Sequence, residues 1–376
     1  MIEVVVTGIG LRSSLGDLEQ SWHRLCQSQT AIALHRLFPE LPTLPLALIG
    51  STPQQLRPLV QIIVQDALDM AGLQSPLPDC GIAIGSSRGC QGELEFLRQH
   101  PEQLSVWPER LLATATNIAA RQIQTHGPVA APMAACATSL WAIAQGYWWL
   151  QQGQCQQVLV GAVETPITPL TLASFKRMGA LATTGCYPFD RDREGLVLGE
   201  GGAVFLLETA QSAQQRQAPL YGRVRGVSLN SDAYHVSAPD PQGKMANRMV
   251  HNCLARSQLS PADIDYIHAH GTSTQRNDRQ ESQLITQVWG DGTVPVSSTK
   301  GATGHTLGAS GALGLAFSLL ALRDQQIPPC VGLRSLEFPL NCVHQAKAAS
   351  IRNCLILSFG FGGQNAALAI SQVTCD

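Results

Sequence analysis

The chain has 376 residues, of which 44% are hydrophobic and only 14% charged, and its net charge is −2. So few charges predict a large buried core or a subunit interface, and the near-neutral balance excludes a nucleic-acid-binding protein. No apolar run reaches the length of a membrane span and the first residues lack the pattern of a signal peptide, so we expect a cytoplasmic protein that is not membrane-bound.

The first half of the chain alternates β-branched runs with longer apolar segments. This pattern predicts strands at residues 4–10, 80–85, 129–133 and 158–161, and helices over 15–28, 59–72, 108–125 and 134–152. Residues 30–58 are proline-rich and weakly patterned, which predicts irregular structure. The helix over 134–152 is apolar on nearly all sides and Gly153 follows it as a C-terminal cap, so we expect it to be buried.

The second half repeats this arrangement. A strand is predicted at residues 266–270, a second apolar helix at 303–322, and a terminal hairpin from two strands at 355–360 and 366–370. Alternating strands and helices are typical of the α/β class with mostly parallel pairing. Because each half has one helix that is apolar all round, we expect two similar halves with their buried helices between sheets.

One of the eleven cysteines lies where chemistry is favoured. The cysteines are scattered singly without metal-ligand spacing, so we expect neither a disulfide framework nor a zinc site. Cys136 alone follows a predicted strand and opens a long helix, whose first turn would lower the pKa of the thiol. Alanines on both sides would admit a substrate. A buried structural cysteine at a tight junction is the alternative interpretation.

Two of the ten histidines also lie at the ends of predicted elements. His270 ends a strand before Gly-Thr-Ser-Thr, and His305 lies in the glycine-rich turn that starts at Lys300. Each alone is more typical of a structural residue. Together with a cysteine, however, two neutral imidazoles suit the condensation of thioesters, because their N–H groups can stabilise an enolate without a metal.

The segments around these residues resemble a known family. Residues 135–138, 270–274, 300–305 and 358–363 resemble the four signatures of β-ketoacyl-acyl carrier protein synthases I and II, and residues 188–201 resemble a fifth. The resemblance implies a thiolase-like fold in which two similar halves stack as five layers (αβαβα). It places the nucleophile in a half formed by residues 1–225, and the histidines and the oxyanion loop in a half formed by residues 226–376.

The same resemblance implies a reaction and its residues. Cys136 would carry the acyl group, His270 and His305 would promote decarboxylation of malonyl-acyl carrier protein, and Lys300 would support them, giving a 3-oxoacyl product in fatty acid or polyketide synthesis. The backbone N–H groups of Cys136 and Phe361 would form the oxyanion hole, and the Phe361 side chain would act as a gate beside the cysteine. Phe175 would line the acyl pocket. The residues implied to contact the phosphopantetheine arm or the substrate are Thr272, Thr274, Gly360 and Gly362. No metal and no resident cofactor are implied, because phosphopantetheine arrives on the carrier protein. The enzyme would be an acyltransferase and usually a homodimer.

Three positions depart from the family pattern. Gly314 stands where a glutamate is usual, and His268 and Leu357 each replace a usual asparagine. The resemblance implies that these positions cluster and help to hold a structural cation. We therefore hypothesise that this protein binds no such cation.

The expected carrier-protein contact is also altered. Of the usual basic cluster near residues 50–60 only Arg57 remains, and Lys176 and Arg177 are possible substitutes. The chain is also shorter than typical members of the family, mostly before residue 70. We hypothesise a specialised synthase with a dedicated carrier protein.

Other interpretations remain open. The protein could be the ketosynthase of an aromatic or aryl-polyene polyketide system that pairs with a chain-length factor, or a degenerate subunit that only shapes a partner's cavity. Gly8 and Gly10 hint at dinucleotide binding, but Ser13 stands where the third glycine belongs, so a tight turn is expected. The aromatic cluster of Trp141 and Tyr147–Trp149 is expected to pack in the core or at a dimer interface.

Overall fold

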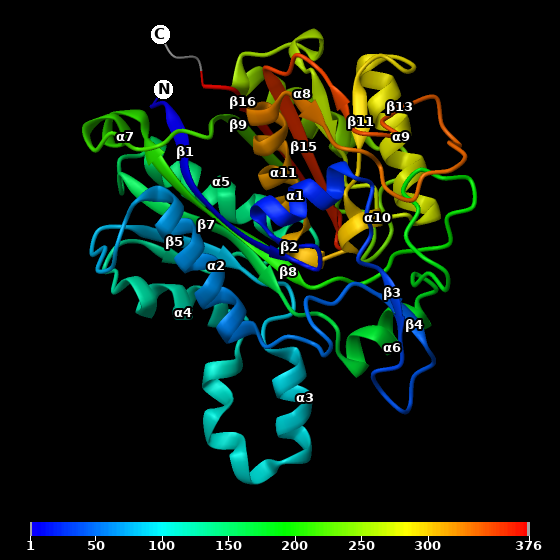
Figure 1. Ribbon diagram of the computed structural model, residues 1–376, viewed down its shortest axis with the longest axis horizontal. Coiled ribbons are helices and arrows are strands. Elements are labelled where there is room, and N and C mark those ends of the chain that lie inside the picture. Colours follow the sequence, from blue (N-terminus) through cyan, green and yellow to red (C-terminus); the bar gives the residue numbers. More distant parts are fainter. Residues whose placement is uncertain (1, 374–376) are drawn as a thin grey trace.

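The computed structural model describes residues 2–373 and has one large sheet as its framework (Figure 1). The strand order is β13-β11-β10-β15-β16-β9-β1-β8-β7-β5-β6, and β1 and β9 join the two halves. The strands of the first half are β1 (Val4–Ser13), β5 (Gly81–Gly85), β6 (Val129–Ala130), β7 (Gln157–Glu164) and β8 (Gly201–Thr209). Those of the second half are β9 (Gly222–Ser231), β10 (Tyr266–His268), β11 (Pro295–Ser297), β13 (Asn341–Cys342), β15 (Asn353–Gly360) and β16 (Gln364–Ser371).

The two halves have the same topology. In chain order, β1, β5, β6, β7 and β8 take the same relative places in the sheet as β9, β10, β11, β15 and β16. Helix α2 (Leu56–Ala71) follows the first strand of one half, as α8 (Lys244–Ser257) does in the other. Helix α5 (Thr138–Gln151) and helix α11 (Ser310–Asp324) likewise precede the fourth strand of each half.

The helices complete five layers. Helix α2 packs on β1 and β8, together with α4 (Thr114–Ile123). Helices α5 and α11 contact each other and lie between the two halves of the sheet, while α8 covers β9 and β16 beside α9 (Gln275–Trp289). Helix α11 is buried along residues 310–322, because its surface consists of Gly, Ala, Leu, Ser and Phe side chains. The expected thiolase-like fold of two similar halves is therefore confirmed.

The expectation that the strands pair mostly in parallel was partly wrong, because the sheet contains both parallel and antiparallel pairs. The pairs β5–β6, β5–β7, β10–β11, β10–β15 and β11–β13 are parallel, but β1, β8, β9 and β16 pair antiparallel with their neighbours. Strands covered on both faces have apolar runs in either orientation, so their composition does not reveal their direction. The hairpin of β15 and β16 is as predicted.

Several boundaries differ from those predicted. The segment 108–125 divides into a 3₁₀ helix (Pro101–Arg110) and α4, and the strand at 129–133 shrinks to β6. The two helices predicted over 15–28 and 59–72 are confirmed as α1 (Leu18–Cys26) and α2, although their first and last residues differ from the prediction. The segment 30–58, predicted to be irregular, contains the short hairpin of β3 (Ala33–His35) and β4 (Leu44–Leu46) before α2 begins. The remaining short elements are β2 (Gly16–Asp17), α3 (Gln91–Gln99), α6 (Pro169–Arg177), α7 (Ala210–Gln215), α10 (Lys300–Thr303), β12 (Gln326–Ile327), β14 (Lys347–Ala348) and two 3₁₀ helices (Pro261–Asp263 and Leu307–Ala309).

Residues Leu307–Asp324 are long and apolar enough to cross a membrane by length and composition, but 89% of this window is buried inside the protein. The ten cysteines within residues 2–373 are all free, as expected.

Candidate active site

Cys136 lies in a tight turn between β6 and α5. The preceding Ala135 has a left-handed φ of 47°, and the helix begins only at Thr138 after its cap at Ala137. The expectation that Cys136 belongs to the first helical turn was therefore wrong by two residues. Its carbonyl oxygen accepts a hydrogen bond of 2.9 Å from Ser358 Oγ on β15, which ties the nucleophile's backbone to the second half.

The structure brings Cys136, His270 and His305 together. The cysteine sulfur and a ring nitrogen of each histidine lie within 4.8 Å of one another, and all three side chains are buried. The imidazole rings meet edge to face, with centroids 5.4 Å apart. His270 follows β10, which ends at His268, and His305 lies between α10 and α11, so neither histidine belongs to the element predicted for it.

Burial controls the ionisation of the cysteine. It raises the pKa of the Cys136 thiol to about 11, although Lys300, Arg88 and a hydrogen bond from the Phe361 backbone oppose the shift. The predicted lowering of this pKa was therefore wrong for the resting site. Because a thiolate is disfavoured in an apolar surrounding, the protonated thiol is the favoured form of Cys136 at physiological pH.

Burial has the opposite effect on the histidines. It lowers the pKa of both His270 and His305 well below the usual range, and the nearby Lys300 adds to both shifts. Both imidazoles are therefore neutral at physiological pH. His305 Nδ1 lies 2.8 Å from Ser310 Oγ, a contact that the sequence analysis did not anticipate.

Lys300 and Glu281 hold the loop of His270. Lys300 Nζ donates to the carbonyl oxygen of His270 and lies 3.5 Å from its Nδ1. The carboxylate of Glu281 accepts from the backbone N–H groups of His270 and Gly271 at 2.6 and 2.7 Å. Burial raises the pKa of Glu281 and lowers that of Lys300, and the attraction of the two opposite charges opposes both shifts. Glu281 was missed because it lies one turn inside α9, where an acidic residue usually indicates a solvated face.

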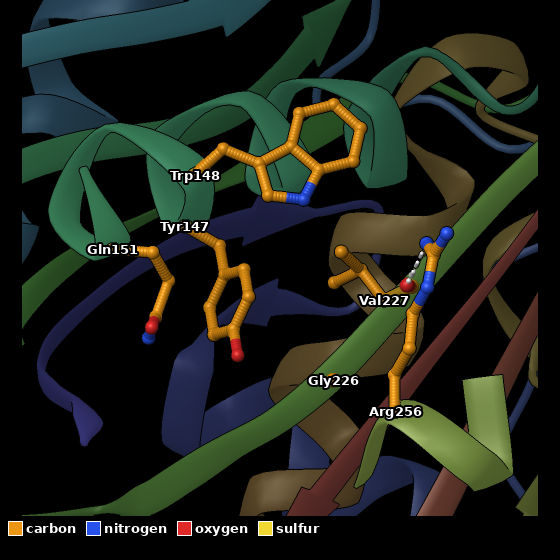
Figure 2. A pocket seen from close by; sticks show the side chains of 6 residues that line it. All are labelled: Tyr147, Trp148, Gln151, Gly226, Val227 and Arg256. Atoms are coloured by element: carbon orange, nitrogen blue, oxygen red, sulfur yellow. Dashed lines mark hydrogen bonds between the residues drawn. The ribbon is translucent and has the colours of Figure 1, made fainter. Parts of the chain in front are cut away.

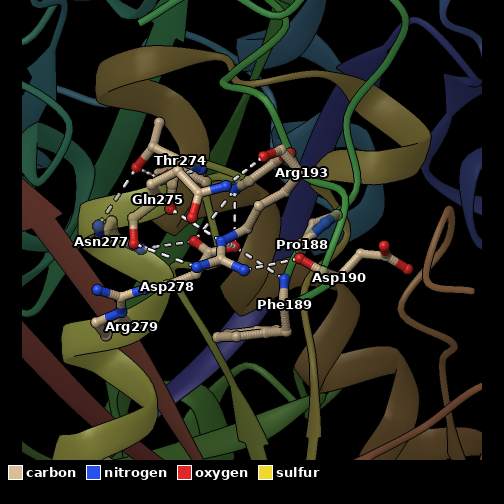
Figure 3. A network of polar contacts seen from close by, with 12 residues as sticks. Pro188, Phe189, Asp190, Arg193, Thr274, Gln275, Asn277, Asp278 and Arg279 are labelled. Atoms are coloured by element: carbon tan, nitrogen blue, oxygen red, sulfur yellow. Dashed lines mark hydrogen bonds and ion pairs between the residues drawn. The ribbon is translucent and has the colours of Figure 1, made fainter. Parts of the chain in front are cut away.

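A second polar network locks the segment 271–275 (Figure 3). Arg193 is fully buried, and its Nε lies 3.8 Å from the carboxylate of Asp278 and 3.4 Å from the carbonyl oxygen of Thr274. Asp278 in turn accepts from the backbone N–H groups of Phe189 and Ser273. The segment around Phe189 and Arg193, expected as a fifth signature, therefore supports the histidine loop from the first half.

The glycine-rich turn after β15 lies against the backbone of the nucleophile. A Cβ at Gly360 would lie 2.6 Å from the carbonyl oxygen of Ala134 and 3.1 Å from the backbone nitrogen of Cys136. Only glycine allows this approach, which places the backbone of Phe361 beside the thiol. Gly362 has a left-handed φ of 80° that favours glycine. This geometry suits the predicted oxyanion hole.

Apolar side chains surround the cysteine. Cys136 packs in a cluster with Phe175, Ile167, Leu172, Leu196, Leu198 and Leu307, and Phe361 contacts its edge. The rings of Phe175 and Phe361 lie 6.0 Å apart. Thr272 and Thr274 join their hydroxyl groups at 2.9 Å, and Thr274 also caps α9. Their predicted contact with phosphopantetheine stays a prediction.

Two of the three unusual residues, His268 and Gly314, compensate for each other in side-chain volume. A Cβ at Gly314 would lie 2.6 Å from Nδ1 of His268, so the imidazole occupies the space that a side chain at 314 would need. His268 Nε2 lies 3.2 Å from Thr299 Oγ1, and burial lowers the pKa of this histidine to about 3. Leu357 follows Ile356, which pairs with His268 in the sheet, and the Leu357 side chain packs in a core cluster with Ile267. The expected cluster of the three positions around a cation stays a prediction. The absence of a cation stays a prediction.

The expected carrier-protein contacts lie at the surface. Arg57 is half-buried and pairs with Glu109 at 3.2 Å, whereas Lys176 and Arg177 are exposed in the last turn of α6. Their role in docking also stays a prediction.

A cavity of about 300 Å³ has a lining that includes none of Cys136, His270 and His305 (Figure 2). It is lined by Tyr147, Trp148, Gln151, Gly226, Val227 and Arg256, and Arg256 donates to the carbonyl oxygen of Val227 at 3.1 Å. Tyr147 and Trp149 are buried in the core, as expected for this aromatic cluster.

Comparison with known proteins agrees with this site. The model of the beta-ketoacyl synthase N-terminal domain matches residues 51–213, and that of the C-terminal domain matches residues 221–334. The 3-oxoacyl-[acyl-carrier-protein] synthase 2 of Mycobacterium bovis is 33% identical over 98% of this chain and 97% of its own. The same enzyme of Rhizobium meliloti is 34% identical over the full length of both chains.

Among solved structures, the ishigamide ketosynthase/chain length factor covers 99% of this chain with 26% identity, and this chain covers 100% of it with a TM-score of 0.91. The predicted family is thus confirmed by the chain's sequence relatives as well as by its fold. The chain belongs to the beta-ketoacyl synthase family of condensing acyltransferases.

Proposed function

We propose that the protein condenses an acyl group carried on Cys136 with malonyl-acyl carrier protein, releasing carbon dioxide and 3-oxoacyl-acyl carrier protein. The observation that carries this proposal is the convergence of one thiol and two neutral imidazoles within 4.8 Å, with all three side chains buried. In the first step the sulfur of Cys136 attacks the acyl thioester. The carrier's sulfur leaves with the thiol proton, and the acyl group stays on Cys136.

Neutral histidines fit the second step. When the carbon–carbon bond to the malonyl carboxylate breaks, its electron pair forms an enolate whose oxygen needs hydrogen-bond donors. The ammonium of Lys300 faces Nδ1 of His270 and can only donate, which leaves the proton of this imidazole on Nε2. Ser310 can donate to Nδ1 of His305 and leave its Nε2–H free in the same way. Two N–H groups would then face the enolate oxygen.

The glycine-rich turn serves the last step. The enolate carbon attacks the acyl carbonyl, and the oxyanion that forms would accept hydrogen bonds from the backbone N–H groups of Cys136 and Phe361. Collapse of this intermediate forms the 3-oxoacyl product and expels the Cys136 thiolate, which is then reprotonated. No metal takes part in these steps.

Mass spectrometry of the intact protein tests this scheme. Incubation with acyl-carrier proteins should add the acyl mass to Cys136, and malonyl-carrier protein should remove it with formation of 3-oxoacyl product. Cys136→Ala should abolish loading, whereas Cys26→Ala, outside the site, should not. His270→Ala and His305→Ala should still load but lose decarboxylation. Loading of the Cys136→Ala variant would contradict the proposal.

The acyl carrier protein is the proposed partner, in a homodimer in the cytoplasm. The names of the relatives support the carrier protein, and the edge strand β6 with the exposed side chains of Val129 and Met133 supports pairing of two chains. A second candidate is a polyketide ketosynthase paired with a chain-length factor, favoured by the likeness to the ishigamide pair. Co-purification of a related subunit that lacks the cysteine would identify the second candidate.

A further inference from the structure

Arg88 is a cation beside the nucleophile that the reaction above does not use. It lies in the turn after β5, and it is one of the two cations close enough to lower the pKa of the Cys136 thiol. Its Nε is buried and makes no hydrogen bond, and within residues 2–373 no carboxylate oxygen lies within 4.0 Å of its guanidinium. A buried donor without an acceptor is costly, so a role for this group is expected.

The fold places this arginine beside the apolar cluster that contains Cys136. Its guanidinium carbon lies 5.7 Å from the ring centre of Phe175, which packs in the apolar cluster of Cys136. Phe175 also contacts Phe361, so Arg88 and the predicted gate share one aromatic neighbour. The leucines of this cluster suit an alkyl chain on Cys136, whereas Arg88, which is half-buried, brings a buried Nε–H without an acceptor to the edge of the cluster.

The turn that carries Arg88 is firmly built. Glu164 is fully buried at the end of β7 and accepts from the backbone N–H of Ser87, the hydroxyl of Ser86 at 3.1 Å and the backbone N–H of Arg88 at 3.3 Å. The carboxylate is thus engaged with the backbone of the turn and does not pair with the guanidinium. The turn holds Arg88 in place, and the charge of Arg88 opposes the rise in the pKa of Glu164 that burial causes.

We propose that Arg88 is a specificity-determining residue that recognises an anionic oxygen group, such as a carboxylate, on the acyl chain bound to Cys136. The planar guanidinium matches a carboxylate through two parallel hydrogen bonds, and the apolar surroundings strengthen them. This inference rests on the proposed function, because it names the class of acyl group that the same cysteine accepts.

Paired acyl donors test the inference. The carrier protein is loaded with adipyl or with 6-methylheptanoyl, which has the same shape without the charge, and the rate of acyl transfer to Cys136 is measured by intact-protein mass spectrometry. The native enzyme should prefer adipyl. Arg88→Leu should lose about ten- to a hundredfold of the adipyl rate while 6-methylheptanoyl changes by less than about threefold, because a hydrogen bond to a charged group contributes of this order. Arg88→Lys should retain part of the preference, and Arg248→Leu, an exposed arginine on α8, should behave like the native enzyme.

Two results would overturn the inference. If Arg88→Leu slows both donors equally and shifts the pH dependence of Cys136 alkylation upward, Arg88 serves only to stabilise the thiolate. If both donors load equally well in the native enzyme, the residue does not select an anion, although the condensing function stands. If neither these nor unbranched acyl groups load Cys136, the proposed function itself fails, and the inference with it.

Discussion

Gly360→Ala should disable condensation while leaving the nucleophile in place. The added Cβ would lie 2.6 Å from the carbonyl oxygen of Ala134, well inside the roughly 3.5 Å at which non-bonded atoms make favourable contact, and 3.1 Å from the nitrogen of Cys136, which is also tight. Both neighbours are backbone atoms in a turn fixed by Ser358, so they cannot move aside easily. The loop that carries Phe361 must therefore retreat by roughly half an ångström.

Such a shift weakens the proposed oxyanion hole, which requires donors within about 2.7–3.1 Å of the developing charge. Loss of one donor costs about 2.7–4 kcal/mol of transition-state stabilisation, so kcat for condensation should fall by about a hundred- to a thousandfold. Alkylation of Cys136 by iodoacetamide should continue, because it needs no oxyanion hole. Gly92→Ala is the matched control, since its Cβ would only meet a methyl group of Thr168 at 3.4 Å. A Gly360→Ala enzyme that keeps kcat within about threefold of the native value would refute the reasoning.

Three further results are expected from the same geometry. Gly314→Ala should lower the Tm and the free energy of unfolding by about 1–3 kcal/mol through overpacking against His268, and adding His268→Ala should restore most of the loss; an unchanged Tm would contradict the proposed compensation. Because the pKa values of His270 and His305 are lowered, their neutral N–H forms persist as the pH falls through 6.5, so the rate of decarboxylation of malonyl-carrier protein should stay level between about pH 8 and 6. The rate of alkylation of Cys136 should instead rise with pH toward the thiol pKa of about 11. A decarboxylation rate that halves near pH 6.5 would show that a histidine titrates normally. The thiol and two imidazoles are also ligands that Zn²⁺ prefers, so micromolar Zn²⁺ should inhibit condensation and slow alkylation, and a chelator should reverse both effects while leaving untreated enzyme unchanged.

The sequence predicted the reacting residues better than the residues that contact them or hold their loops in place. Cys136, His270 and His305 lie beside glycine-rich turns and element ends, where local patterns reveal them. Glu281 lies inside a helix and Arg88 in an ordinary turn, and their importance depends on what the fold brings beside them. Residues of this kind follow from long-range packing, so no local signal marks them.

The fold shows the same division. Both apolar helices between the sheets were recognisable because their sequences are apolar on every face, as α11 illustrates. The direction of β1 was not, because a strand buried on both faces has the same composition whether it runs parallel or antiparallel. The ends of α5 and α11 were also misplaced, because residues 134–137 and 304–309 have compositions compatible with a helix. Residues 134–137 instead form a turn before α5, and residues 304–309 form a turn and a short 3₁₀ helix before α11.

One physical property, the burial of the site, determines the protonation of all three reacting groups. Burial keeps His270 and His305 neutral, which makes them suitable donors to an enolate, and the same burial keeps the Cys136 thiol protonated. An enzyme that acidified its cysteine by opening the pocket to water would also allow its histidines to titrate. The site instead opposes the thiol shift locally, chiefly through Lys300, and the same Lys300 disfavours protonation of the histidines. A cation near the cysteine thus serves both requirements, because it stabilises the thiolate and repels the second positive charge that an imidazolium would bring.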